Sequence, residues 1–183
     1  MDDPETVAAG ARLPFYAAAE RAVFELDEPS RRAVAHRVRR SRRRAHGWRL
    51  TMDEQFAQIA DACARPRDAD DGVWITPRLR ALYAVLHGVG IAHSFELYTD
   101  DPADRRPAAG IIGVLIGRAA MLESMTHCVP HAGNALLSLT LDALADQGFD
   151  FADIQLPSDH TVRLGARLIA REQFEARLRD AVS

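Results

Sequence analysis

Lysine is absent from this chain of 183 residues, so all 23 basic residues are arginine. Cysteine is rare: Cys63 and Cys128 lie far apart and lack the spacing of zinc ligands, which predicts neither a metal site nor a disulfide framework. No apolar run approaches the roughly 20 residues that cross a bilayer. The opening "MDDPETVAAG" carries acids where a signal peptide carries basic residues. These absences predict a cytoplasmic protein with no membrane partner and no metal.

The chain does have enough apolar residues for a core, and it has one strongly basic segment. Hydrophobic residues make up 48% of a length that fits one domain, or a small domain joined to a larger one. Nine of the arginines lie between positions 31 and 49 with no acid among them, although the net charge is -3. Val34, Val38 and Trp48 are interleaved with these arginines, which indicates that one side of the segment packs against the rest of the protein.

The basic segment is a candidate nucleic-acid contact. The planar guanidinium of arginine can bind a phosphate through two parallel hydrogen bonds, so a run of arginines without acids suits a nucleic-acid backbone. Two other interpretations stay open from the residues alone. The segment can be a solvated, partly helical surface, or it can reflect the arginine bias of a GC-rich genome.

Two helices are predicted in the first half of the chain. "LTMDEQFAQIADACA" opens with Thr51 and Glu54, three residues apart as in a capping box, and then places apolar residues at helical spacing. "WITPRLRALYAVLHGVG" offers Thr76 as an N-cap and Pro77 as the first helical residue. Both segments are therefore predicted to be amphipathic helices.

Strands are predicted in the middle of the chain, followed by alternating elements. "AHSFELYT", "IIGVLIG" and "AAMLESM" have the patterns of strands, and the turn-rich "DDPADRRPAAG" predicts a hairpin between the first two. After them come a long helix, "HAGNALLSLTLDALADQG", a short strand, "FADIQL", a helical turn at "SDHTVRLG", a strand, "RLIA", and a terminal helix. This order predicts an α/β fold built on a mixed sheet, and it resembles the acyl-CoA N-acyltransferase (GNAT-like) architecture.

The polar stretch 65–72 is the predicted domain boundary. It separates a small N-terminal subdomain with the Arg-rich segment, 1–70, from a GNAT-like catalytic domain, 71–183. Acetyl-CoA users of that architecture hold pyrophosphate on a glycine-rich turn before the long helix. The corresponding "THCVPHAGNAL" has one glycine, a proline and no arginine or lysine. An acetyl-CoA-dependent reaction is therefore poorly supported.

Five motifs carry a resemblance to a known family. They are W-I-T-P, A-H-S-x-E, E-S-M, D-x-Q and D-H-x-x-x-L-G-A, and together they span about residues 73–167. In order and spacing they resemble the core of the leucyl/phenylalanyl-tRNA-protein transferases. The Arg-rich segment followed by a helix also matches that family's layout. The resemblance implies that an amino acid is moved from its tRNA to the N-terminal amine of a protein bearing Arg or Lys, with aminoacyl-tRNA as co-substrate and no cofactor.

Such a reaction requires that an amine be positioned and deprotonated and that an oxyanion be stabilised, because an aminoacyl ester is already activated. Asp153 and Gln155 are two apart in a predicted strand and so project from one face. The resemblance implies that they relay the proton of the acceptor amine, whereas the residues alone also allow a solvent-facing polar edge. Glu123 interrupts an apolar strand, where an unpaired carboxylate is costly, so we expect it in a polar cleft. The resemblance implies that Glu123 holds the donor's ammonium group, and a buried salt bridge with Arg118 is the alternative.

Two further sets of residues complete the predicted site. A pocket for a Leu or Phe side chain is expected from apolar residues that could equally be plain core: Met121, Leu122, Met125, Leu137 and Leu141. Contacts with tRNA are expected from six arginines: Arg37, Arg39, Arg40, Arg42, Arg43 and Arg44. His93 and His160 lie inside matched motifs, but a lone histidine on an apolar strand is usually a hydrogen-bonded core residue, and we favour that for His93.

The chain departs from the family at several positions. The family's A-S-K at the start of the long helix reads "AGN" at 132–134, Leu122 replaces the usual glycine, and Thr126 replaces an aromatic residue, so a reshaped pocket is expected. The family's G-I-F-P-W block and C-terminal extension have no counterpart. Two alternatives stay open: an aminoacyl-tRNA-dependent enzyme with a small-molecule amine acceptor in a biosynthetic pathway, and a non-catalytic tRNA-binding module.

Overall fold

The structure is a computed structural model, and it describes residues 18–65, 75–101 and 103–183. Its strands are β1 (Glu20–Glu25), β2 (Arg49–Met52), β3 (Ala92–Tyr98), β4 (Ala109–Ile116), β5 (Ala119–His127), β6 (Phe151–Asp153) and β7 (Arg167–Ala170). Its helices are α1 (Glu28–Arg37), α2 (Arg39–Arg44), α3 (Phe56–Cys63), α4 (Pro77–Gly88), α5 (Ala132–Asp146), α6 (Asp159–Leu164) and α7 (Arg171–Val182). Within the described ranges the strands form one sheet in the order β2-β3-β4-β5-β6-β1-β7. Neighbouring strands are antiparallel except for β5 and β6, which are parallel.

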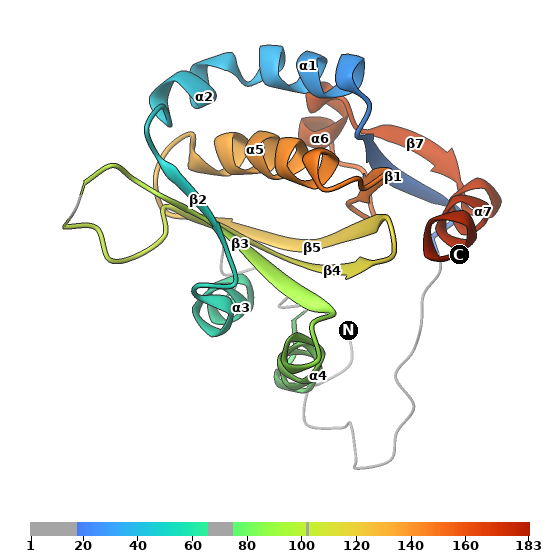
Figure 1. The fold of residues 1–183 in the computed structure, drawn as a ribbon, viewed down its shortest axis with the longest axis horizontal. Coiled ribbons are helices and arrows are strands. Elements are labelled where there is room, and N and C mark those ends of the chain that lie inside the picture. Colours follow the sequence, from blue (N-terminus) through green and yellow to red (C-terminus); the bar gives the residue numbers. More distant parts are fainter. Residues whose placement is uncertain (1–17, 66–74, 102) are drawn as a thin grey trace.

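Helices cover both faces of this sheet (Figure 1). On one face α5 packs against β3, β4 and β5, and α1 and α2 pack on the outer side of α5. On the other face α3 packs against β3, β4 and β5, and α4 packs against β3. Met121 contacts both the apolar cluster under α3 and α4 and the cluster under α7, so α7 shares that face. The sheet is thus buried between two helical layers, and sites can form where its strands diverge.

Most of the predicted elements are present. The side chain of Thr76 accepts the N–H of Leu79 and caps α4, with Pro77 at its start. β3 and β4 are antiparallel neighbours, as the predicted hairpin requires. The predicted long helix is α5, and three leucines on it are buried: Leu137, Leu141 and Leu144. The predicted α/β fold with a mixed sheet is confirmed.

The capping box predicted at Thr51 and Glu54 is wrong. Arg49–Met52 form the edge strand β2, and α3 begins only at Phe56. The hydroxyl of Thr51 donates instead to the buried carboxylate of Glu96, at 2.6 Å. The local helix signal is a weak preference. It is outweighed because residues 49–52 pair with β3 and because the buried carboxylate of Glu96 needs hydrogen-bond donors.

The division at residue 70 stays a prediction, because 66–74 lie outside the described residues, as does Trp74 of the W-I-T-P motif. Strands from both sides of the division belong to one sheet: β1 and β2 precede it, and the other five follow it. Helices α1 and α2, which hold most of the Arg-rich segment, bury Val34 and Val38 in the core on the α5 face. The interleaved apolar residues therefore do pack against the rest of the protein.

Candidate active site

A split in the sheet forms the centre of the candidate site. β6 runs beside β5 only as far as Asp153, which pairs with Met121. Beyond this pair β5 continues to His127, whereas β6 ends at Asp153. A cavity of about 210 Å³ opens there, and residues of both diverging segments line it: Leu122–Met125 on one side and Ile154 with Leu156 on the other.

Glu123 lies in a β-bulge at this split. Ile112 on β4 pairs with Ser124, and Gly113 pairs with Leu122, so Glu123 has no partner on β4. A bulge bends the strand and re-aims the side chain of the extra residue. The bulge explains how an apolar strand accommodates a carboxylate, because Glu123 borders the cavity and does not pack in the core.

The carboxylate of Glu123 accepts hydrogen bonds from two neutral side chains. Nε2 of Gln155 donates to its Oε2 at 2.5 Å, and Tyr83 of α4 donates a second bond. Burial raises the pKa of Glu123, and the charge of Asp153 raises it further, while the two hydrogen bonds and the charge of Arg21 oppose this rise. Burial and the nearby Glu123 also raise the pKa of Tyr83, which keeps its hydroxyl protonated as a donor.

Arg118, the alternative partner considered for Glu123, is bound elsewhere. Its Nε donates to a carboxylate oxygen of Asp150 at 3.1 Å. Its Nη2 donates to the backbone carbonyl of Asp180, also at 3.1 Å. The predicted alternative of a salt bridge between Glu123 and Arg118 is therefore wrong.

Asp153 is fully buried and is bound from two directions. Arg21 of β1 donates through Nε to Oδ1 at 3.2 Å and through Nη2 to Oδ2. The backbone N–H of Gln155 donates to Oδ1 at 3.1 Å. Burial raises the pKa of Asp153, and the Arg21 guanidinium and the N–H of Gln155 oppose this rise.

Gln155 lies outside the strand, so strand alternation is the wrong reason for its alignment with Asp153. β6 ends at Asp153, and Gln155 has a φ of 64°, in the left-handed region. Its backbone carbonyl accepts the N–H of Ala22 at 3.0 Å. The structure brings the two predicted residues together, but it does so through a turn that the Asp153 carboxylate holds.

The cavity contains three of the five residues predicted for a side-chain pocket: Leu122, Met125 and Leu137. Met121 packs against the clusters on the opposite face, because strand alternation turns it away from Leu122. Leu141 is buried in the core and does not line the cavity. Other lining residues gave no signal in the sequence: Phe24, Ile111, Ile154, Leu156 and Thr161.

Two polar contacts of the site were also not predicted. Tyr83 belongs to an apolar helical stripe, where a tyrosine is indistinguishable from core until its hydroxyl is seen against Glu123. Arg21 precedes the matched motifs and is separated from Asp153 by 132 positions. No pattern in one sequence could have found that pair.

The Arg-rich segment forms an open concavity of about 550 Å³, lined by Arg37, Arg39, Arg40, Arg43 and Arg44. All five are exposed, and within the described residues none of the salt bridges involves them. Arg42 is turned toward α5, where it donates to Ser138 at 2.8 Å and to Asp142 at 2.6 Å. We call the five arginines that line the concavity the arginine surface; Arg42 does not belong to it.

The arginine surface adjoins the elements that carry the cavity. Ser41 of α2 is hydrogen-bonded to Nδ1 of His131, at the start of α5, at 3.2 Å. The guanidinium of Arg37 approaches Gly165, which ends α6. Thr161 of α6 lines the cavity. One continuous part of the molecule therefore carries both features.

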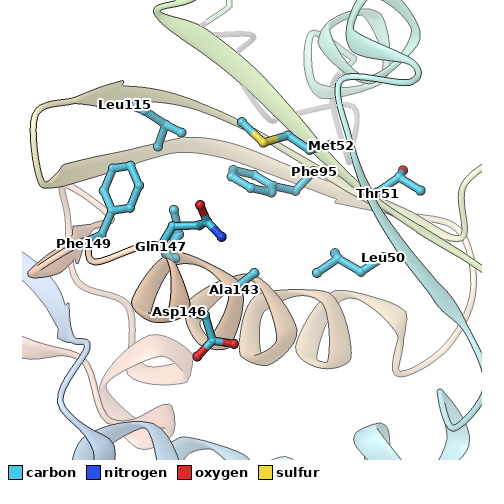
Figure 2. Close-up of a pocket in the computed structure, with 10 residues that line it drawn as sticks. Leu50, Thr51, Met52, Phe95, Leu115, Ala143, Asp146, Gln147 and Phe149 are labelled. Atoms are coloured by element: carbon cyan, nitrogen blue, oxygen red, sulfur yellow. The ribbon is translucent and has the colours of Figure 1, made fainter.

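A second cavity, of about 550 Å³, lies between β2, β3 and the last turns of α5 (Figure 2). Apolar side chains make up most of its wall, among them Leu50, Phe95 and Phe149, and Asp146 points away from them in Figure 2. None of the predicted site residues lines it.

The two histidines of the matched motifs make local contacts. Nδ1 of His93 lies 2.7 Å from Oδ2 of Asp53, and its Nε2 lies 3.1 Å from the carbonyl oxygen of Gly90. Nε2 of His160 lies 2.9 Å from Oδ1 of Asn134 and links α6 to α5. These contacts fit the prediction that His93 is a hydrogen-bonded structural residue.

Among the described residues, no helix has the length and apolar character needed to cross a membrane. The same residues contain no group of three or more His, Cys, Asp or Glu side chains that could hold a metal ion.

Comparison with solved structures places the fold among proteins of similar architecture. FemX superposes with a TM-score of 0.60 at 10% identity, over 90% of this chain and 64% of FemX. A conserved protein of unknown function from Bacteroides thetaiotaomicron gives a TM-score of 0.52 at 14% identity, over 88% of this chain and 55% of that one. At such low identity the likeness concerns the fold alone.

Comparison of sequences is more specific. Residues 27–179 match the sequence model of the family described as leucyl/phenylalanyl-tRNA protein transferase, and the chain belongs to this family. Two curated relatives carry the name leucyl/phenylalanyl-tRNA–protein transferase. The one from Lawsonia intracellularis is 37% identical over 135 residues, 73% of this chain and 58% of the relative. The one from Chromobacterium violaceum is 38% identical over 135 residues, 74% of this chain and 56% of the relative. The chain therefore spans somewhat more than half the length of these relatives.

Proposed function

We propose that the protein is an aminoacyltransferase that moves an amino acid from aminoacyl-tRNA to an amine, most simply the N-terminal amine of a protein. One observation carries the proposal: Glu123, Gln155 and Asp153 are linked by hydrogen bonds beside an apolar cavity in a split sheet. The names of the relatives support Leu or Phe as the donor amino acid. The split sheet supports a GNAT-like arrangement, and an aminoacyl-tRNA substrate places the reaction in the cytoplasm.

The donor occupies the cavity. Its apolar side chain contacts Leu122, Met125 and Leu137, and its ammonium group binds the Glu123 carboxylate at the cavity wall. A volume of about 210 Å³ suits a single apolar side chain. Met121 and Leu141 do not line the cavity, so they stabilise the core and do not contact the donor.

The acceptor amine attacks the carbonyl carbon of the bound ester. A carbon–nitrogen bond forms, the bond between the carbonyl carbon and the ribose oxygen breaks, and the proton lost by the amine ends on that oxygen. Because Nε2 of Gln155 donates to Glu123, Oε1 is the atom that accepts an N–H of the incoming amine. Asp153 fixes Gln155 through the backbone bond, and the ester supplies the activation, so no covalent enzyme intermediate is required.

The tRNA backbone binds the arginine surface. Five exposed guanidinium groups around one concavity suit several phosphates at once. Since the arginine surface adjoins α5 and α6, a bound backbone has a short path from it to the cavity.

The proposal is tested by incubating the protein with tRNA charged with one radiolabelled amino acid at a time, with a protein bearing N-terminal Arg and a pool of small amines as acceptors. We expect label on the protein from Leu or Phe, and its loss in Gln155→Ala. Gln173→Ala, at an exposed position of α7, is the matched control and should transfer normally. Label only on small amines would indicate that the acceptor is a small-molecule amine of a biosynthetic pathway. Binding of tRNA without transfer to any amine would contradict an enzymatic function.

A further inference from the structure

Arg21 is a polar residue beside this site that has no role in the proposed reaction. It lies on β1, before the matched range 27–179, and reaches the carboxylate of Asp153 on the neighbouring strand β6. Both carboxylate oxygens are engaged: Nε donates to Oδ1 and Nη2 donates to Oδ2. The guanidinium carbon also lies 4.9 Å from the centre of the Phe174 ring of α7. A bidentate pair against an aromatic ring is a fixed arrangement, because the planar fork of arginine has one orientation that satisfies both.

The Asp153 carboxylate passes this constraint on to Gln155. Its Oδ1 accepts the backbone N–H of Gln155, whose φ of 64° is one that a residue with a side chain rarely adopts. Such a conformation persists when surrounding contacts hold it. The amide of Gln155 in turn donates to Glu123. A continuous series of hydrogen bonds therefore runs from Arg21 through Asp153 and Gln155 to Glu123.

We propose that Arg21 is a positioning residue: it holds the buried Asp153 carboxylate in its ionised form, and through it fixes the turn that presents the Gln155 amide to the acceptor amine. This inference deepens the proposed transferase function and rests on it. Arg21 is 23% exposed in its side chain and is not among the residues that line the cavity, so we assign it a role through Asp153 and not by contact with the substrate.

The electrostatics of the surrounding groups give the direction of the effect. Burial raises the pKa of Asp153, and Arg21 is the cation that opposes this rise. Glu123, from β5, is the neighbouring acid, and the charge of Asp153 raises the pKa of Glu123. From α7, Arg177 is paired with Glu25. Without Arg21 the pKa of Asp153 rises further, and a protonated carboxyl group is a weaker acceptor for the N–H of Gln155.

A matched control is available on the same face of the sheet. Arg177 makes a bidentate pair with Glu25, at 2.8 and 2.7 Å, and lies 4.6 Å from the centre of the Phe151 ring. It thus has the same chemistry as Arg21, an arginine paired with a carboxylate over an aromatic ring, without a link to Gln155. The test compares Arg21→Gln and Arg21→Lys with Arg177→Gln.

Two measurements are made on the full chain over pH 5 to 9: the rate of amino-acid transfer at saturating donor, and the chemical shift of the Gln155 backbone amide by NMR. We expect the acid limb of the rate profile of Arg21→Gln to move to higher pH by about 1 to 3 pH units, the size of the effect of a close opposite charge. The Gln155 amide should titrate over the same range. Arg21→Lys should recover part of the change in both readouts, and Arg177→Gln should match the wild type.

The inference is overturned if the Gln155 amide and the acid limb are unchanged in Arg21→Gln, or if Arg21→Gln and Arg177→Gln lose activity to the same extent without movement of the limb. If the wild-type protein transfers no amino acid, the proposed function fails, and the Gln155 amide alone still decides the role of Arg21. If Arg21→Gln does not fold, Arg21→Lys decides it, since the same titration is expected there at smaller amplitude.

Discussion

At the residue scale, the proposed chemistry depends on two carboxylates in different surroundings. Asp153 is paired with a cation and bonded to backbone, which suits a fixed anchor. Glu123 receives only neutral donors, an amide and a phenol, and borders the cavity. A carboxylate that is not hydrogen-bonded to a cation is the one that can bind an ammonium group from a substrate. The environments of the two acids therefore assign them different roles.

Glu123→Gln should lower kcat/KM for transfer by about 10- to 100-fold, because a hydrogen bond to a charged group contributes about 1.5–3 kcal/mol. The pH profile adds a sharper test. The ionised form binds the ammonium group, and the pKa of Glu123 is raised, so wild-type activity should fall as the pH drops through that raised pKa. Glutamine does not titrate, and this part of the acid limb should be absent from the variant. Glu172→Gln, on the exposed start of α7, should keep the wild-type profile, and an unchanged limb in Glu123→Gln would refute the assignment.

Leu122→Ala should change which amino acid is transferred. Leu122 lines the cavity and is 6% exposed, so its truncation enlarges the space for the donor side chain. We expect the ratio of Phe to Leu transfer to rise several-fold, at a cost of about 2–5 kcal/mol in stability. Leu141→Ala removes the same atoms from the core without lining the cavity, and should destabilise the protein while leaving the ratio unchanged. Equal ratios in the two variants would contradict the proposed pocket.

At the scale of elements, α3 packs closely on β4, on the face of the sheet where α4 contributes Tyr83 to the core. A Cβ on Gly110 of β4 would overlap Cδ1 of Ile59 on α3, so the helix lies directly against the strand at a residue that has no side chain. Ile59 is 3% exposed and belongs to the same apolar cluster as Tyr83. The close approach of α3 therefore depends on the missing side chain.

Gly110→Ala should lower the free energy of unfolding by about 1–3 kcal/mol, since the added methyl group must displace Ile59 or shift α3. Urea denaturation measures the change. Gly88→Ala is the control: Gly88 ends α4 and a Cβ there meets nothing within 4 Å, so this variant should be neutral or slightly stabilised. Comparable destabilisation of both variants would mean that the contact between α3 and β4 is not tight.

At the scale of the whole molecule, charge is distributed unevenly. The net charge is -3, yet five exposed arginines surround one concavity. An acidic protein as a whole repels a polyanion, so the proposed binding of tRNA has to be local and oriented by that surface. The same surface lies beside α5 and α6, which connects binding of the backbone with the cavity.

Affinity for tRNA should fall steeply with salt. Five phosphate contacts predict that log K declines against log[salt] with a slope of roughly -3 to -5. A variant with Gln at Arg39, Arg40, Arg43 and Arg44 keeps only Arg37, so it should bind much more weakly with a slope of roughly -1, as measured by filter binding at several salt concentrations. Arg42→Gln is the matched control from the same helix, because Arg42 is bonded to Ser138 and Asp142; it should alter stability and keep the slope. A wild-type slope in the quadruple variant would locate tRNA elsewhere.

The sequence by itself determined the elements and the order in which they occur. The Thr76 cap and the apolar spacing of α5 depend on neighbours a few positions away, and such local patterns are readable in one chain. Glu123 could be singled out because it contrasts with the apolar residues beside it, whereas Asp153 and Gln155 were singled out through the resemblance of the D-x-Q motif. Local signals failed where a distant partner competed, as at Thr51, which serves Glu96 from a strand and does not cap a helix.

Only the tertiary structure decided how these residues are arranged. The bulge at Glu123 depends on the register between β4 and β5, and the left-handed turn at Gln155 depends on a carboxylate that Arg21 holds from 132 positions away. It also decided that Leu122 faces the cavity while Met121 faces the opposite core, and that Arg42 binds α5 while its neighbours face solvent. The physical reason is common to all of them: burial, register and ion pairing are set by groups that meet only when the chain is folded.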